Sequence, residues 1–126
     1  METEYSTDFA VFPEHINFHG TLFGGALLSK MDVAAATLAR KVLYGSDADG
    51  AVTANMDKVD FHLPGHVGDI IKINCKVKSL GRSSILIQVK VYREDREGQV
   101  QKICTAMFTF VAMKDGKPFH HGLSFS

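Results

Sequence analysis

Residues 17–45 read NFHGTLFGGALLSKMDVAAATLARKVLYG and decide the fold, because they hold the one long amphipathic helix pattern of the chain. When successive residues are placed 100° apart, the apolar side chains form one broad stripe, made up of Leu27, Met31, Ala34, Ala35, Leu38 and Val42. Gly45 follows this stripe, which is typical of the position just beyond a helix C-terminus. The spacing therefore predicts a single long helix with one buried face.

The sequence after this helix alternates apolar and polar residues, which is the pattern of strands with one buried face. Strands are predicted over 52–63, 69–80, 85–93 and 101–113, and STDFAVF at 6–12 is a further strand candidate. No second helix pattern lies between the later strands, so parallel crossover connections are excluded. We expect an α+β fold in which residues 1–126 form one domain, with an antiparallel sheet packed on the helix.

The composition excludes several classes of function. Lys plus Arg and Asp plus Glu number 14 each, and this balance argues against a general nucleic-acid binder. No apolar run approaches the roughly 18 residues of a membrane span, and the N-terminal METEYSTDFA lacks the plan of a signal peptide. Cys75 and Cys104 fit no metal spacing, and the histidines show no ligand pattern. We expect a cytoplasmic protein with two buried free thiols, no metal site, and neither membrane nor nucleic acid as a partner.

Asp32 lies at the margin of the apolar stripe rather than on the wet face of the predicted helix. Its neighbours one turn away are Leu28, Ser29, Ala35 and Ala36, so no basic side chain is placed to pair with it. An ionised carboxylate in such surroundings costs several kcal/mol unless it is paired or hydrated, and charges of this kind gather at functional sites. Two interpretations remain at this point: a catalytic carboxylate, or a helix residue paired with a lysine at a subunit contact.

Gly24 and Gly25 precede the helix and either satisfy a tight turn or expose bare amides at the positive end of the helix dipole. Such amides suit a developing oxyanion. Gly25 and Asp32 are seven positions apart, about 10 Å along a helix, so one carbonyl cannot contact both within a chain. If both act on one group, the spacing predicts a two-fold dimer that pairs one chain's helix start with the other chain's Asp32, with Asn17 nearby or across the interface.

Four segments in order resemble the hotdog-fold acyl-CoA thioesterases, and most of all the short-chain bacterial acyl-CoA hydrolases and their brain-type relatives. The first is NxxGxxFGGxxLxxMDxAAxxxA over 17–39, and the second is VTANMDKVDFHLPGHVGD over 52–69. GRSS at 81–84 and FTFVAMKDGKP at 108–118 match the family's turn and closing strand. The resemblance spans nearly the whole chain, so it is far more specific than any one segment.

The resemblance implies a long central helix wrapped by a curved antiparallel sheet, in a homodimer that often assembles into a trimer of dimers. It implies hydrolysis of acyl-CoA to free acid and coenzyme A, with no cofactor, because coenzyme A is part of the substrate. The family's catalytic carboxylate maps to Asp32 and its catalytic asparagine to Asn17, and these two act from opposite chains. Asp32 would activate a water or attack the thioester directly, while Asn17 and the amides near Gly24 and Gly25 stabilise the oxyanion.

The turn Gly81–Ser84 is the predicted contact for the phosphates of coenzyme A, because Arg82, Ser83 and Ser84 can donate hydrogen bonds to anions. Three other functions are alternatives to hydrolysis. One is a hotdog module that binds acyl-CoA without turning it over, and another is a bare oligomerisation scaffold. A hotdog dehydratase is disfavoured, since its helix should carry a histidine. Phe108 and Phe110 are predicted to lie in the core rather than in an acyl pocket.

Overall fold

The computed structural model describes residues 1–125, which form one α-helix, one short 3-10 helix and six β-strands. In chain order these are β1 (Glu4–Ala10), the 3-10 helix (Pro13–His15), α1 (Gly24–Val42), β2 (Gly50–Phe61), β3 (Ile70–Leu80), β4 (Ser84–Glu94), β5 (Val100–Lys114) and β6 (Lys117–Pro118). The predicted helix and the five predicted strands are confirmed, whereas the 3-10 helix and the two-residue β6 were not expected. Among residues 1–125, no helix has the length and apolar character needed to cross a membrane.

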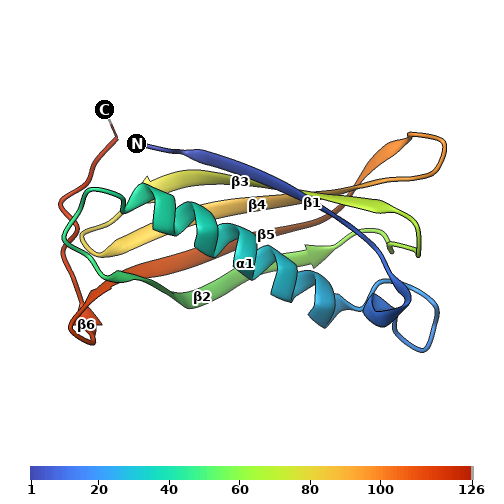
Figure 1. The fold of residues 1–126 in the computed structure, drawn as a ribbon, viewed down its shortest axis with the longest axis horizontal. Helices are drawn as coiled ribbons and strands as arrows, with labels where there is room; N and C mark the ends of the chain where they lie inside the picture. Colours follow the sequence, from blue (N-terminus) through green and yellow to red (C-terminus); the bar gives the residue numbers. More distant parts are fainter. Residues whose placement is uncertain (126) are drawn as a thin grey trace.

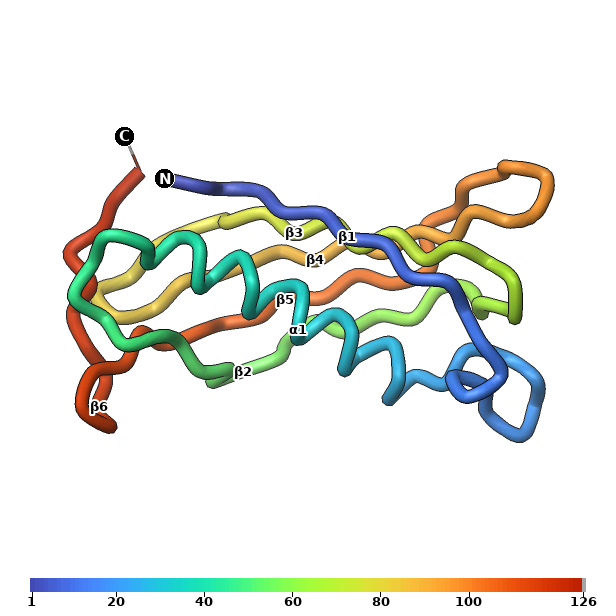
Figure 2. Tube along the Cα trace, viewed as in Figure 1, coloured from blue at the N-terminus to red at the C-terminus, as the bar shows by residue number. Residues whose placement is uncertain are grey.

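The strands form one antiparallel sheet in the order β1-β3-β4-β5-β2, and β6 adds to β5. Figure 1 shows α1 lying obliquely across one face of this sheet. In Figure 2, β1 passes on one side of the helix and β2 on the other. This single helix on a curved antiparallel sheet confirms the α+β arrangement expected of the hotdog fold. β1 and β2 form the two edges of the sheet. β2 is the strand that follows α1 in the chain.

The core lies between the apolar face of α1 and the inner face of the sheet. The buried helix residues are Leu27, Met31, Ala34, Ala35, Leu38, Ala39 and Val42, which are the predicted stripe together with Ala39. The register pairs Val89 of β4 with Cys75 on one side and Ala106 on the other, all with side chains facing the helix. Phe108 and Phe110 are 0% and 1% exposed, which confirms them as core residues. Alanines on the helix let it approach the sheet closely, and this fixes its rotation.

β2 differs from the other strands because almost every residue in it is exposed. It pairs with β5 on one side only, and its other edge is unpaired within residues 1–125. The register shifts between Asp57 and Asp60, where Lys58 has a φ of 52°. A free edge of 12 residues is a ready template for another strand.

Cys75 and Cys104 are free thiols buried in the core, as the sequence predicted. Burial raises the pKa of the Cys75 thiol to about 12. Burial, followed by the negative charge of Asp60, raises the pKa of the Cys104 thiol to about 11, against a smaller lowering by a backbone hydrogen bond. The Cys104 Sγ lies 3.8 Å from the Met31 Sδ, so this thiol packs directly on the helix.

These thiols make stability fall in alkaline solution. In the unfolded chain a thiol loses its proton above about pH 8.5, whereas in the folded chain both thiols keep theirs until about pH 11. The unfolded state then binds fewer protons, so the free energy of unfolding decreases between these limits by about 1.4 kcal/mol per pH unit and thiol. Chemical denaturation at pH 8, 9 and 10 measures the slope. The Cys75→Ala/Cys104→Ala variant should show a shallower slope, and equal slopes for the two proteins would contradict this account.

Candidate active site

The helix α1 begins with backbone amides that have no acceptor. Phe23 is the N-cap residue, and its side chain makes no capping hydrogen bond. The first helical hydrogen bond runs from the Leu27 N–H to the Phe23 carbonyl at 3.0 Å. Within residues 1–125, the amides of Gly24 and Gly25 therefore donate to nothing. Two free N–H groups at the positive end of a helix dipole form an anion or oxyanion site.

Aromatic rings cover both of these glycines. A Cβ at Gly25 would lie 2.7 Å from the Cε2 of Phe23, so the absence of a side chain makes room for that ring. A Cβ at Gly24 would lie 3.5 Å from the Cζ of Phe61, which comes from the end of β2. The free amides thus lie in apolar surroundings, where a hydrogen bond to a charged oxygen is stronger than in water.

Asp32 is half-buried on α1, and its carboxylate is held by a residue that the sequence did not single out. The Thr53 Oγ1 donates a hydrogen bond of 2.7 Å to the Asp32 Oδ1. Within residues 1–125, no lysine or arginine nitrogen lies within 4.0 Å of this carboxylate, so the predicted lack of a basic partner holds inside the chain. Since Thr53 occupies Oδ1, the Oδ2 of Asp32 remains to accept a proton or orient a water.

Asn17 organises the loop that leads into the helix. Its Oδ1 accepts hydrogen bonds from the backbone N–H of His19 at 2.9 Å and of Thr21 at 3.1 Å. Its Nδ2 donates to the Thr21 Oγ1 at 3.0 Å, which leaves the second Nδ2 proton for a ligand. The structure places Asn17 on the loop before Gly24, and no hydrogen bond joins it to Asp32 within residues 1–125.

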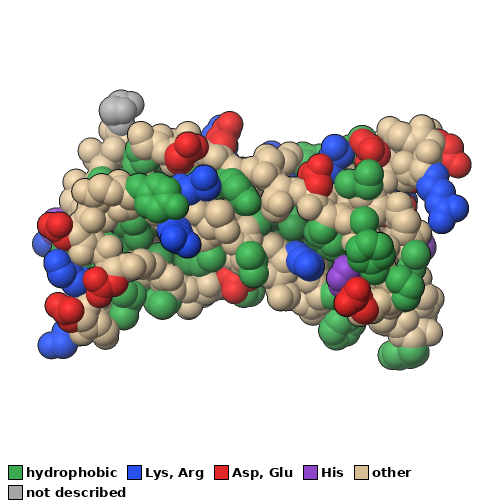
Figure 3. Space-filling view, viewed as in Figure 1, with side chains coloured by type: hydrophobic (Ala, Val, Ile, Leu, Met, Phe, Trp, Pro, Cys, Tyr) green, Lys and Arg blue, Asp and Glu red, His purple; other side chains and the backbone are tan. Residues whose placement is uncertain are grey.

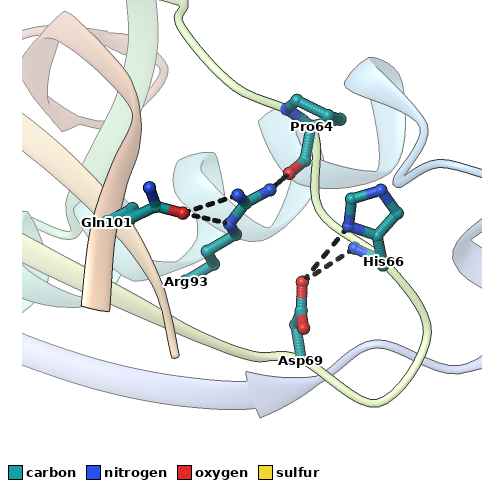
Figure 4. Close-up of polar contacts among 5 residues, drawn as sticks. All are labelled: Pro64, His66, Asp69, Arg93 and Gln101. Atoms are coloured by element: carbon teal, nitrogen blue, oxygen red, sulfur yellow. Dashed lines mark hydrogen bonds and ion pairs between the residues drawn. The ribbon is translucent and has the colours of Figure 1, made fainter. Parts of the chain in front are cut away.

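A second loop, residues 62–69, supports the first. The Leu22 N–H donates to the Gly65 carbonyl at 2.8 Å. The Arg93 guanidinium donates to the Gln101 Oε1 at 2.6 and 3.1 Å and also to the Pro64 carbonyl (Figure 4). We call these three residues, Arg93, Gln101 and Pro64, the loop clamp. It ties the loop to β4 and β5, and no sequence pattern predicts it.

A cavity of about 310 Å³ opens beside the helix start. Its walls are Leu22, Gly24, Leu27, Phe61, His62, Leu63, Pro64, Gly65 and Ile103. Most of these side chains are apolar, and Gly24 belongs to the wall. The free amides therefore lie at the border of a pocket that can hold an apolar group.

The turn Gly81–Ser84 is well ordered but stands away from the helix start. Figure 2 shows it at the end of the sheet opposite to the start of α1. A Cβ at Gly81 would meet the Ser84 Oγ, so a side chain there would force the serine hydroxyl to rotate. The Arg82 side chain is exposed, while its carbonyl accepts the His121 N–H at 3.1 Å. Within one chain the predicted phosphate contact and the predicted oxyanion amides are therefore not brought together.

His121 anchors the C-terminal segment to this turn. Its buried ring accepts the Leu123 N–H on Nδ1 at 2.9 Å, so Nε2 carries the proton and donates to the Ser84 carbonyl at 3.1 Å. The other histidines are more exposed, and His19 lies on the surface of the loop at 17–21. Within residues 1–125, no three His, Cys, Asp or Glu side chains lie close enough to hold a metal ion.

Comparison with known proteins places this arrangement in one family. The thioesterase superfamily matches residues 19–99. The acyl-CoA thioester hydrolase YciA of Salmonella typhimurium is 33% identical over 111 residues, which is 84% of this chain and 80% of that protein. The crystal structure of a hexameric thioesterase from Yersinia pestis has a TM-score of 0.85 and 32% identity, covering 94% of each chain.

A third relative has been solved with ligands. The acyl-CoA hydrolase of Staphylococcus aureus, in complex with butyryl coenzyme A, coenzyme A and coenzyme A disulfide, has a TM-score of 0.84 and 35% identity, covering 93% of this chain and 70% of that one. Structures of its variants exist in which an asparagine, an aspartate or a threonine is replaced by alanine, and the asparagine variant contains coenzyme A. The asparagine and aspartate are separated by the same number of positions as Asn17 and Asp32.

Removing the loop clamp should loosen both loops of the site. In Arg93→Leu, the Pro64 carbonyl loses its charged donor, and the hydrogen bond from Leu22 to Gly65 then rests on a freer loop. We expect hydrogen exchange to become about tenfold faster at the amides of 62–69 and of Leu22, with the centre of α1 unchanged. Lys102→Leu, an exposed change on the neighbouring strand, is the control. Equal exchange in the two variants would show that the clamp does not hold the loops.

Proposed function

The chain belongs to the thioesterase superfamily and hydrolyses acyl-CoA thioesters, and we propose that it does so at sites shared between two protomers. In each site, Asp32 of one protomer faces the Gly24 and Gly25 amides of the other. The observation that carries this proposal is a pair of contacts along β2. Thr53 holds Asp32 at one point of the strand, and Phe61 covers Gly24 eight residues further on.

A two-fold axis through the free edge of β2 brings these two points together. When two identical strands pair antiparallel, the residues that lie opposite each other are equally far from the axis. An axis near Asp57 therefore sets Thr53 of one chain opposite Phe61 of its partner. This closes the gap of about 10 Å that separates Gly25 from Asp32 within one helix. It also covers the 12-residue edge, which would otherwise stay open to aggregation.

The chemistry follows from the two halves of such a site. The thioester oxygen accepts hydrogen bonds from the Gly24 and Gly25 amides and from the remaining Nδ2 proton of Asn17, which stabilise the negative charge that develops there. The partner's Asp32 takes a proton from a water through its Oδ2, and that water attacks the carbonyl carbon. The thiolate of coenzyme A leaves without needing strong acid help. Direct attack by the carboxylate is the competing route.

The relatives support these assignments. In the Staphylococcus aureus hydrolase, alanine was substituted for an asparagine and an aspartate at the spacing of Asn17 and Asp32, and separately for a threonine. That threonine follows the aspartate by 17 positions, whereas Thr53, the threonine that contacts the carboxylate here, follows Asp32 by 21. Because the Thr53 hydroxyl donates to Oδ1, it orients the carboxylate so that Oδ2 points to the water.

Coenzyme A is bound, in this proposal, by the turn Gly81–Ser84 of the protomer that does not supply the amides. The turn and the helix start lie at opposite ends of one sheet, and a two-fold axis brings opposite ends of two sheets to the same side. Arg82 has its side chain free to reach a phosphate, while Ser83 and Ser84 add hydroxyl donors. His121 supports the turn from behind through the Ser84 carbonyl.

We extend the proposal to the setting of the enzyme. Residues 1–126 act as one domain, the reaction needs no cofactor, and the dimers assemble further, as in the hexameric relative from Yersinia pestis. The two buried free thiols are those of a protein that works in a reducing compartment, which favours the cytoplasm.

Mixing two inactive variants tests the shared site and the reaction together. Release of free thiol from acyl-CoA is measured for Asp32→Ala and Asn17→Ala, each of which should lose at least about 100-fold in kcat. When equal amounts are unfolded and refolded together, half of the dimers are mixed, and each holds one site with both residues intact. The mixture should regain about a quarter of wild-type activity.

Each variant refolded alone is the control and should stay inactive. Recovery of no activity in the mixture would place both residues in the same protomer's site. Full activity of Asp32→Ala by itself would remove the carboxylate from the mechanism altogether.

The phosphate contact has its own test, because only the nucleotide end of the substrate is charged. Arg82→Ala should raise KM for acyl-CoA by about fivefold to tenfold, and leave kcat nearly unchanged. KM for the matching acyl-pantetheine, which lacks the nucleotide, should not change. Lys30→Ala is the control, since Lys30 lies over the Phe9 ring of β1, at the sheet edge away from the proposed interface. An equal rise in KM for both substrates would rule out a phosphate contact.

A further inference from the structure

The cavity beside the helix start has the composition of a site for a hydrocarbon chain. Its walls include Leu22, Leu27, Leu63 and Ile103, and its volume of about 310 Å³ lies at the small end of ligand pockets. If each CH₂ group occupies about 30 Å³, the volume of a water molecule in the liquid, the cavity holds roughly ten CH₂ groups. Every wall residue named here belongs to one chain.

Phe61 is the wall residue that links this cavity to the free amides. Its ring atoms lie 3.5–4.0 Å from the position of a Cβ on Gly24, so the ring covers the first helical residue. Its position opposite Cys104 in the register sets it at the end of β2, where the chain leaves the sheet. The side chain is 50% exposed, so it is not one of the residues on which the core depends.

We propose that Phe61 determines which acyl chains the enzyme accepts; this rests on the proposed position of the thioester at the Gly24 and Gly25 amides. A thioester oxygen bound at those amides places the first carbons of the acyl chain beside the Phe61 ring. The rest of the chain then continues between Leu22, Leu27 and Ile103. The ring packs against the first carbons of short acyl chains, and it limits the space available to long or branched acyl chains.

The burial of each methylene group sets the expected dependence on chain length. A buried CH₂ group improves kcat/KM by about fourfold until the cavity is full. For a cavity of this volume, the rise should extend to an acyl chain of about eight carbons. Chains beyond that length leave the pocket and gain nothing further from it.

Acyl-CoA substrates from two to sixteen carbons test the proposal on wild type and three variants. Phe61→Ala should lower kcat/KM for the two- to four-carbon substrates by about tenfold, and move the maximum to chains longer by about two to four carbons. Leu63→Phe fills the same cavity from another wall and should move the maximum to shorter chains. Met56→Ala is the matched control, because Met56 lies on β2, is 41% exposed and does not line the cavity.

A binding readout separates this proposal from the hydrolytic one. Calorimetry with a series of non-hydrolysable acyl-CoA thioethers gives the same chain-length profile without turnover. If wild type binds the series with the expected profile, and Phe61→Ala shifts it, the role of Phe61 stands whether or not the chain hydrolyses the thioesters. If Phe61→Ala lowers binding or kcat/KM equally at all lengths, as Met56→Ala would if it weakened the dimer, the proposal is overturned.

Discussion

The rest of the structure depends on the burial of one face of α1 against the sheet. Within residues 1–125 there is no other α-helix for α1 to pack on, so the strands set its rotation. Met31 and Leu38 are completely buried beneath it, and Ala34, Ala35 and Ala39 bring its backbone close to the strands. With this rotation fixed, Asp32 falls at the edge of the buried stripe, on the side where β2 passes, and the helix start falls beside the end of β2. One packing interaction therefore positions both the carboxylate and the amides of the candidate site.

The contacts of Asp32 explain how α1 tolerates a carboxylate at the margin of its apolar stripe. A carboxylate without a basic partner is tolerated because it is only half-buried and because the Thr53 hydroxyl satisfies Oδ1. A lysine in place of that hydroxyl would have neutralised the charge. A neutral donor instead fixes the orientation of the carboxylate and leaves its charge available. These are the properties that the proposed general base needs, and within residues 1–125 no lysine or arginine pairs with the carboxylate.

The sequence predicted those features that depend on local periodicity, and missed those that depend on tertiary register. The face of α1 and the inward residues of β3 to β5 could be read from spacing, because burial selects apolar residues at a fixed period. The contact of Thr53 with Asp32 spans 21 positions, and that of Arg93 with Pro64 spans 29. Neither contact leaves a periodic trace, since each needs only one polar residue at a point decided by the sheet. β6 was missed for a related reason, as it has two residues and no period at all.

The proposed dimer gives a physical reason why catalysis and assembly belong together in this fold. Within one chain, the candidate oxyanion amides and the proposed phosphate-binding turn lie at opposite ends of the sheet, and Asp32 lies between them on α1. Folding a loop across such a distance would cost conformational entropy in every molecule. A two-fold axis perpendicular to β2, near Asp57, achieves the same juxtaposition with rigid elements, because it sets each end of one protomer beside the other end of its partner. Figure 3 shows that the helix-bearing face of one chain carries hydrophobic side chains among scattered charges of both signs. The proposed site therefore depends on the juxtaposition of two protomers and not on a charged patch of one of them.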